Sequence, residues 1–162
     1  MAKITYDVKL NKTTKHAKVR ALLGSKEVGY VKLNANGKTI VAGERVVRID
    51  WIWVSPEHRG KGIATGMYQA AADFACSLGM KLASDEVLRT GSRGFWEKQR
   101  KHGNAKKKVT TKGVGVRKSR YVLECPARIA NPPKRKSRYV CPSERNGLRE
   151  SHYVCPSERN GL

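Results

Sequence analysis

Alternating apolar and polar residues run through the first third of the chain and predict β-strands. The alternation covers three short segments, residues 3–10, 16–23 and 27–33. Turn-forming residues separate them, and Asn36–Gly37 after the third segment is a strong turn signal. The next segment, 44–54 (ERVVRIDWIWV), is rich in β-branched and aromatic residues, so it is the best strand prediction in the chain.

The apolar spacing becomes helical after this fourth strand. Between Ala64 and Leu78 apolar residues recur every three or four positions, which predicts an amphipathic helix. Gly79 is placed where a helix commonly ends. Residues 81–88 (KLASDEVL) follow and are predicted as another strand.

A second, shorter helix is predicted further along the chain. Ser92 is a candidate cap for its start, and the helix runs to about Lys101 with Phe95 and Trp96 buried. The basic segment 105–123 comes next, and its end, SRYVL, is predicted as a final strand.

The composition changes at Cys125–Pro126. Five of the six prolines lie beyond this point, and SRYVCPSERNGLRE (137–150) is followed by the similar SHYVCPSERNGL (151–162). Two copies of 14 residues are too few to stack into a solenoid. We therefore predict a folded domain at 1–125 and a basic, repeat-containing tail at 126–162, disordered or draped on the domain.

The stretch between the fourth strand and its helix, SPEHRGKGIATGMY, combines glycines with basic residues. The first N–H groups of a helix lack partners within it and carry the positive end of the helix dipole. A glycine-rich loop at this point suits a phosphate or pyrophosphate, and Arg59 and Lys61 add positive charge at its rim. A P-loop is excluded because GxxxxGK[ST] is absent, and the glycine spacing does not fit a dinucleotide fold.

One pattern in this stretch does match a known family. Arg59, Gly62 and Ala64 form Arg-x-x-Gly-x-Ala after WVSPEH, and GSRGFWEKQRKHG (91–103) and SRYVLE follow in the order expected. In these features, over about residues 2–125, the chain resembles the GNAT family of N-acetyltransferases. The resemblance implies an α+β fold with a mixed, mostly antiparallel central sheet flanked by helices. It also implies a V-shaped splay between two central strands.

The resemblance implies acetyl-CoA as the acyl donor. Loop amides would hold its pyrophosphate, the end of the fourth strand would pair with its pantetheine arm, and a backbone N–H near Val54 would bind the thioester oxygen. The residues assigned to the coenzyme on this basis are Ile52, Trp53, Val54, Arg59, Gly60, Lys61, Gly62, Ile63, Ala64, Thr65, Ser92 and Trp96.

The resemblance implies the catalytic residues less directly than the coenzyme residues. An ammonium acceptor with a pKa of about 10 must lose a proton to a base, and Asp50 is the acid inside the central strand, with Asp85 and Glu86 as rivals. Partial burial between Ile49 and Trp51 is expected to raise the pKa of Asp50. The family often has a tyrosine as general acid.

The general acid is the point at which the chain departs from the family pattern. Trp96 stands at the usual tyrosine position, and indole has no useful acid–base chemistry. Trp96 is therefore interpreted first as a core residue. The acid is then Tyr121, Tyr68 or a water molecule, or the thiolate leaves unaided, and we assign Tyr121.

The charge indicates an acidic partner. The chain has 34 Lys and Arg against 13 Asp and Glu, a net charge of +21, and residues 101–120 hold eight basic residues and no acid. The first two strands lie too close in sequence for the helix pair of many family members, which would open the acceptor side. A macromolecular acceptor is therefore expected: a nucleic acid, nucleoprotein or acidic protein, but not a polyamine.

A second function stays open. The same basic surface fits a non-catalytic binding module that keeps the acetyltransferase fold, and the tryptophan at the tyrosine position favours this alternative. Aromatic residues are sparse among the basic segments, so base stacking has little support in the sequence.

The compartment follows from what the chain lacks. No apolar run is long enough for a signal peptide or a membrane span, so a soluble, cytoplasmic protein is expected, with Cys76, Cys125, Cys141 and Cys155 as free thiols. His152 and the later cysteines could ligate zinc, but Cys141 has no close partner, so no metal site is predicted.

Overall fold

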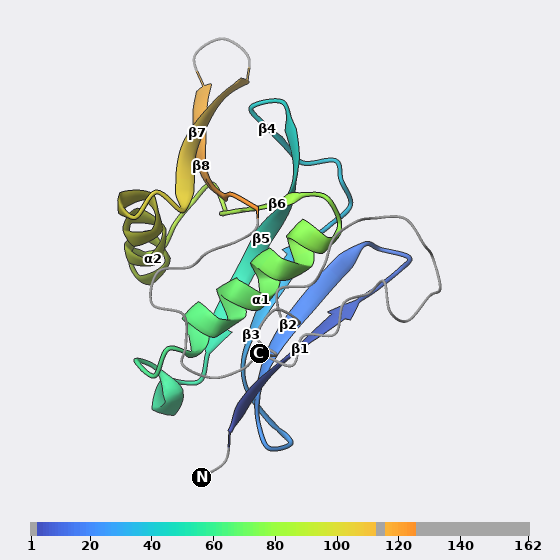
Figure 1. Cartoon of the computed structure of the whole chain (residues 1–162), viewed down its shortest axis with the longest axis vertical. Helices are drawn as coiled ribbons and strands as arrows, with labels where there is room; N and C mark the ends of the chain where they lie inside the picture. Colours follow the sequence, from blue (N-terminus) through green and yellow to red (C-terminus); the bar gives the residue numbers. More distant parts are fainter. Residues whose placement is uncertain (1–2, 113–115, 126–162) are drawn as a thin grey trace, which may run out of the picture.

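A computed structural model describes residues 3–112 and 116–125 of the chain (Figure 1). Its elements are β1 (Ile4–Leu10), β2 (His16–Leu23), β3 (Lys26–Asn34), β4 (Ile40–Val41), β5 (Glu44–Val54), a single 3₁₀ turn (Pro56–His58), α1 (Ile63–Ser77), β6 (Lys81–Ala83), α2 (Thr90–Lys101), β7 (Ala105–Lys112) and β8 (Val116–Leu123). The α+β class is as predicted. The predicted tail lies outside the described residues.

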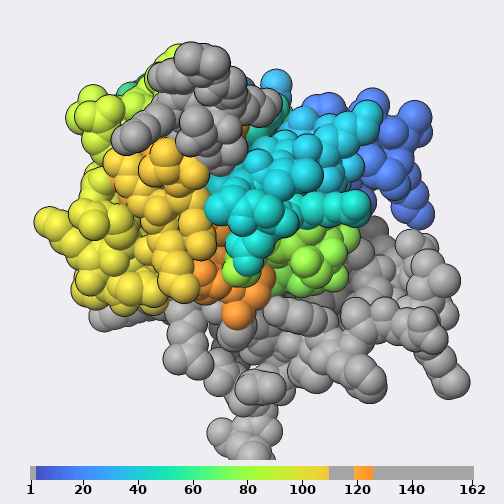
Figure 2. Space-filling model, turned by 90° about the horizontal axis from the view of Figure 1, so that it is seen from above, coloured from blue at the N-terminus to red at the C-terminus, as the bar shows by residue number. Residues whose placement is uncertain are grey.

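The strands of the described part of the chain form one twisted sheet. Its strands follow the order β1-β2-β3-β5-β6-β8-β7, with β4 paired to β5 at the side. Neighbouring strands are antiparallel except for β5 and β6. Seen from above in Figure 2, α2 and β7 (yellow) lie at one end and β1–β2 (blue) at the other. The mostly antiparallel sheet of the prediction is confirmed.

A tight turn joins β1 to β2. The N–H of Lys15 donates to the carbonyl of Asn11 at 2.9 Å, and the Asn11 side chain accepts from the N–H groups of Thr13 and Thr14. This confirms that no helix lies between the first two strands. One face of this part of the sheet is covered by α1 (Figure 1).

The core lies between α1 and the sheet. Val19, Val31 and Leu33 point from the strands to Met67 and Phe74 of the helix, and all five are fully buried. The helix ends as predicted at Gly79 (φ 71°), whose N–H donates to Cys76 while the N–H of Met80 donates to Ala75. This pattern of backbone bonds satisfies the last carbonyls of α1.

The two central strands separate after three residues. β5 pairs with β6 only over Val46–Arg48 and Lys81–Ala83, so beyond these pairs the two strands splay as predicted. The predicted strand at 81–88 is therefore right only for its first three residues. Beyond them the chain binds β8 instead: the N–H of Ser84 donates to Tyr121 at 2.8 Å.

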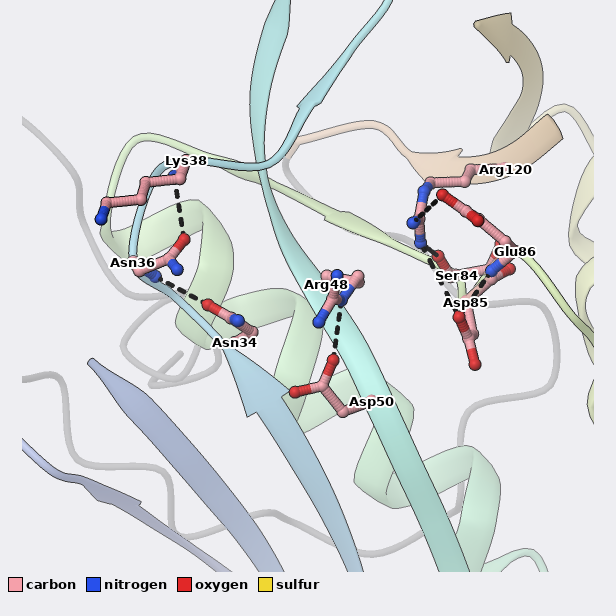
Figure 3. A network of polar contacts seen from close by, with 9 residues as sticks. All are labelled: Asn34, Asn36, Lys38, Arg48, Asp50, Ser84, Asp85, Glu86 and Arg120. Atoms are coloured by element: carbon pink, nitrogen blue, oxygen red, sulfur yellow. Dashed lines mark hydrogen bonds and ion pairs between the residues drawn. The ribbon is translucent and has the colours of Figure 1, made fainter. Parts of the chain in front are cut away.

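Arg120 of β8 holds the chain after β6 in this position. Its buried guanidinium donates to the carbonyl of Ser84 at 2.8 Å and to the carboxylate of Glu86 at 2.6 Å (Figure 3). A paired buried charge stays in place, because breaking either contact would leave a charged group without a partner. These contacts of Arg120 hold residues 84–86 against β8, and so β5 and the chain after β6 stay apart.

Two further sequence predictions need correction, and the basic segment holds a strand that was not predicted. Ser92 does not cap the second helix: α2 begins at Thr90, with Arg89 as the N-cap residue and no side-chain cap. Phe95 is only partly buried. The first half of the basic segment forms a strand of its own, β7, because pairing with β8 outweighs the weak strand preference of AKKK.

The expected free thiols at Cys76 and Cys125 are also wrong. The two cysteines form a disulfide that ties the last turn of α1 to the residue two positions beyond β8. Proximity in the fold, which the 49-residue separation in sequence conceals, brings them together. Cys141 and Cys155 lie outside the described residues. In the described part of the chain, no helix is long and apolar enough to cross a membrane.

Candidate active site

Backbone N–H groups gather where the glycine loop meets α1. Gly60 (φ 73°) and Gly62 (φ 76°) adopt the left-handed conformation, which a side chain would strain. Gly62 is the N-cap residue of α1, and no side chain caps the helix. Within the described ranges, no group accepts a hydrogen bond from the N–H groups of residues 60–65. The helix therefore begins with free donors at the positive end of its dipole.

A pocket of 640 Å³ extends from this loop along β5 to α2. Its lining includes ten of the twelve residues predicted for the coenzyme: Ile52, Trp53, Val54, Arg59, Gly60, Gly62, Ile63, Ala64, Thr65 and Ser92. Of the other two, Lys61 is exposed outside the lining, and Trp96 lines a neighbouring cavity. The fold thus gathers a set of residues that sequence reasoning could only list.

Arg59 connects the loop to the strand. Its Nε donates to the carbonyl oxygen of Val54 at 3.1 Å, and its side chain lines the pocket. The N–H of Ser55 donates to Val28 on β3 at 2.9 Å. Because successive N–H groups of a strand point to opposite edges, that of Val54 points away from β3, to the edge that β6 has left.

A second cavity of 220 Å³ lies between β5 and the segment after β6. Trp51, Ile52, Tyr68, Arg89 and Ser92 line both cavities, so the two adjoin. The guanidinium carbon of Arg89 lies 4.4 Å from the ring centre of Trp51, across the splay. A ligand in the larger pocket can therefore reach the groups of the smaller one.

Asp50 lines the smaller cavity at an irregularity of β5. Lys32 of β3 faces Trp51 and Leu33 faces Ile49, so Asp50 is the extra residue of a β-bulge. The bulge lies just beyond Arg48, the last residue of β5 paired with β6. The Nε of Arg48 donates to Asp50 Oδ1 at 2.7 Å, and the carboxylate is half-buried (Figure 3).

The two rival carboxylates differ in position. Asp85 lines the smaller cavity opposite Asp50, and its Oδ1 accepts from the N–H of Glu86 at 2.7 Å (Figure 3). Glu86 is bound by Arg120 and lines a third cavity, of 250 Å³. Of the three acids considered, the fold therefore brings two together.

Tyr121 is not brought to these residues. It lines the third cavity, and its hydroxyl donates to Glu97 Oε1. Burial first, and then the hydrogen bond to Glu97, raises the pKa of Tyr121, while the same bond lowers the pKa of Glu97. Trp96, only 1% exposed, stacks between Tyr121 and the smaller cavity.

Tyr68 lies where the two cavities meet. Its ring stacks on Phe95 with 4.0 Å between centroids, and its hydroxyl lies 3.5 Å from Ser92 Oγ. Burial raises the pKa of Tyr68. The signal for this residue was present in the sequence: it follows Ala64 by four positions, so it shares the face of the helix that begins at the glycine loop.

Comparison with known proteins identifies this arrangement. The family model of the acetyltransferase (GNAT) family matches residues 4–100. The chain belongs to the GNAT family. No curated protein matches it.

Two solved structures resemble this GNAT chain. A GNAT-family protein from Desulfovibrio desulfuricans is 19% identical, with a TM-score of 0.49, over 67% of this chain and 68% of that one. An acetyltransferase from Thermus thermophilus is 17% identical, with a TM-score of 0.47, over 66% of this chain and 62% of that one.

Membership of the GNAT family supports acetyl transfer in general, with acetyl-CoA as the usual donor. The residues present fit that donor. Free N–H groups at a helix start suit the two phosphates, and the unpaired edge of β5 suits an amide-bearing arm. The pocket of 640 Å³ joins the two, so one elongated anionic ligand can contact both.

Proposed function

We propose that this protein is an acetyl-CoA-dependent N-acetyltransferase acting on an amine of a macromolecule, a protein or nucleoprotein. One observation carries the proposal. The free N–H groups of the glycine loop lie at one end of the larger pocket, and Tyr68 lies where that pocket adjoins the smaller cavity, which Asp50 lines. An anion-binding end and an acid–base end in adjoining cavities are what acyl transfer from a diphosphate-bearing donor requires.

Two groups of the chain take separate roles in the proposed reaction. Acetyl-CoA supplies a thioester that an amine can attack. Asp50, held by Arg48, accepts the amine proton directly or through a water molecule. The N–H of Val54, directed to the unpaired edge of β5, is placed to bind an oxygen on which negative charge develops.

Tyr68 is a better candidate than Tyr121 for the general acid. Its buried hydroxyl holds its proton at neutral pH and faces both cavities, with Ser92 Oγ beside it. The hydroxyl of Tyr121 is engaged by Glu97 on another cavity. We therefore assign proton donation at the leaving sulfur to Tyr68.

The acceptor side supports a large substrate. The chain from β1 to β2 is a five-residue turn, so no helix from this part of the chain closes the site. Lys107 of β7 is exposed and adds positive charge near α2, whereas the neighbouring Lys106 is paired with Glu124 at 3.4 Å. An open, basic approach admits an acidic protein or nucleoprotein more readily than it retains a small amine.

Calorimetry with acetyl-CoA tests the coenzyme site. Gly62→Glu is expected to abolish binding, because it places a carboxylate at the phosphate-binding N–H groups. Gly37→Glu is the matched control, since both glycines have a positive φ and open space at Cβ, but Gly37 lies in a distant turn. Equal binding by the two variants would refute the site.

Mass spectrometry tests turnover. Proteins and RNA from a cell lysate are incubated with the enzyme and isotope-labelled acetyl-CoA, and labelled amines are then located. Label that depends on the wild-type chain and disappears with Gly62→Glu identifies the acceptor. Binding of acetyl-CoA without labelled product would instead indicate a non-catalytic binding module.

A further inference from the structure

Aromatic and basic side chains gather on the face of the sheet opposite α1. Strand register places them in two rows across β1, β2, β3 and β5. The first row is Lys9, Lys18, Lys32 and Trp51, and the second is Asp7, Arg20, Tyr30 and Trp53. Partners in register lie on the same face, and so do residues two apart on a strand. We call these eight residues the open face.

The aromatic residues of the open face lie together, with two exposed tryptophans and the partly buried Tyr30. Trp51 is 42% exposed and Trp53 is 37% exposed, whereas Val19 and Val31, on the opposite face, are fully buried under α1. Tyr30 and Trp53 lie 5.7 Å apart between ring centres. Contiguous exposed aromatic rings usually mark a binding surface, because their burial is otherwise favourable.

Cations surround these rings. Lys18 Nζ lies 4.5 Å and Lys32 Nζ 5.8 Å from the ring centre of Tyr30, and the guanidinium of Arg89 lies over one face of Trp51. Asp7, the acid among these eight residues, binds Arg20, and Glu27 of β3 binds Lys18. No carboxylate in the described part of the chain lies within 4.0 Å of Lys9 or Lys32, so both remain available to an anion.

The face extends beyond the coenzyme pocket. Trp51 and Trp53 also line that pocket, but Lys18, Tyr30 and Lys32 line none of the three cavities described above. The donor therefore does not account for them. Rings that can stack on bases, beside cations that can contact phosphates, match the chemistry of a single-stranded nucleic acid. A duplex hides the faces of its bases, and an acidic peptide offers none to stack.

We propose that the open face binds single-stranded nucleic acid. Bases stack on Tyr30, Trp51 and Trp53, and phosphates contact Lys9 and Lys32. A strand on this face reaches the coenzyme pocket at Trp51 and Trp53, which places it beside the acetyl-transfer site. The inference does not depend on the acetyltransferase activity, because the surface exists without a coenzyme.

Fluorescence anisotropy with labelled oligomers of about 20 nucleotides tests the inference on the full chain; this length exceeds the site size of a single stacking surface. The expected order is single-stranded RNA or DNA above duplex of the same length. Stacking contributes about 1–3 kcal/mol per base, so Trp53→Ala and Tyr30→Ala should each weaken single-strand binding about 5- to 150-fold. Ile40→Ala, at an exposed apolar residue off this face, should leave it unchanged.

The two lysines have a separate readout. Lys9→Gln with Lys32→Gln should lower the slope of log affinity against log salt by about 1.4, at about 0.7 per phosphate contact on a single strand. This measurement keeps the test valid if an aromatic substitution disturbs folding, since both lysines are exposed. A preference for RNA or for DNA identifies the natural strand.

Three outcomes would overturn the inference. The first is equal affinity of the chain for single-stranded and duplex oligomers. The second is an affinity for the single strand that neither aromatic substitution changes. The third is displacement of the oligomer by polyglutamate at equal charge. Each would show that the chain responds to negative charge alone, as its net charge of +21 permits. Loss of acetyl-CoA binding in Gly62→Glu with unchanged oligomer binding would separate the two proposals.

Discussion

At the scale of single residues, glycine has three separate roles around α1. Gly60 and Gly62 provide the left-handed backbone of the glycine loop before α1. Gly79 ends the helix. Gly66 has an ordinary backbone conformation, but a Cβ there would overlap the hydroxyl of Tyr6 on β1. The loop glycines and Gly79 were predicted from the sequence by their backbone conformation, whereas the packing of Gly66 against Tyr6 shows only in the fold.

Tyr68→Phe tests the general acid. The phenyl ring keeps the stacking on Phe95 but cannot donate a proton, so kcat with the identified acceptor should fall about 100-fold or more while KM for acetyl-CoA changes little. Tyr121→Phe is the matched control and should stay near the wild-type rate. The opposite ranking of the two variants would return the role to Tyr121.

Asp73 predicts a pH dependence of stability. Burial raises the pKa of this carboxyl on α1 from 3.8 to about 6, although Gln69 donates a hydrogen bond to it at 2.8 Å. Between these values the folded chain holds a proton that the unfolded chain has released. The free energy of unfolding should therefore fall as pH rises from about 4 to about 6, and stay lower above that range.

Asp73→Asn should remove this part of the dependence. Urea denaturation at about pH 7.5 is expected to show a gain in the free energy of unfolding of up to about 3 kcal/mol for the variant, reduced toward zero at about pH 4. A variant that follows the wild type at both pH values would show that Asp73 has the same proton affinity in the folded and unfolded chain.

At the scale of elements, β5 determines the site. Its first half pairs with both β3 and β6, its bulge at Asp50 marks the change, and its second half pairs with β3 alone. The free edge beyond Arg48 then forms one wall of the pocket. The strand itself was predictable from its composition, but the point at which its partner leaves depends on Arg120, which is distant in the sequence.

Gly66→Ala tests how closely α1 packs on the sheet. The added methyl group would force Tyr6 aside or lift the helix, which should lower the free energy of unfolding by about 1–3 kcal/mol. Gly94→Ala on α2 is the control. Its Cβ meets no atom within 4 Å, so helix propensity alone should raise stability by about 0.5–1 kcal/mol. Similar effects at both sites would contradict the packing argument.

At the scale of the whole molecule, the disulfide connects the two halves of the fold. Cys76 lies in the last turn of α1, which covers β1–β3, and Cys125 follows β8, which belongs to the sheet beyond the splay. Such a link across 49 residues mainly restricts the unfolded chain. The sequence argument for free thiols relied on the expected compartment and had no access to this distance.

Cys76→Ser should lower the free energy of unfolding by about 2–4 kcal/mol relative to the oxidised wild type. The comparison is made by urea denaturation, with the wild type measured in the presence and absence of reductant. Reduced wild type should match the variant. Alkylation of Cys76 in the denatured, unreduced chain would show that the pair does not form.

The local features of this protein follow from its sequence. The strands at 16–23 and 44–54, the turn at 11–15, the helix that ends before Gly79 and the glycine loop were all predicted, and the structure has each of them. These features depend on the backbone and on neighbours a few positions away. Periodicity, turn residues and glycine conformation are therefore sufficient to locate them.

Tertiary structure decided which residues face one another. It placed Tyr68 and not Tyr121 on the cavity that Asp50 lines, bound the chain after β6 to Arg120, and paired Cys76 with Cys125. It also aligned aromatic and basic residues that are scattered in the sequence into the open face. Each outcome depends on strand register and on side-chain contacts between distant positions, and neither quantity is encoded in any single stretch of the chain.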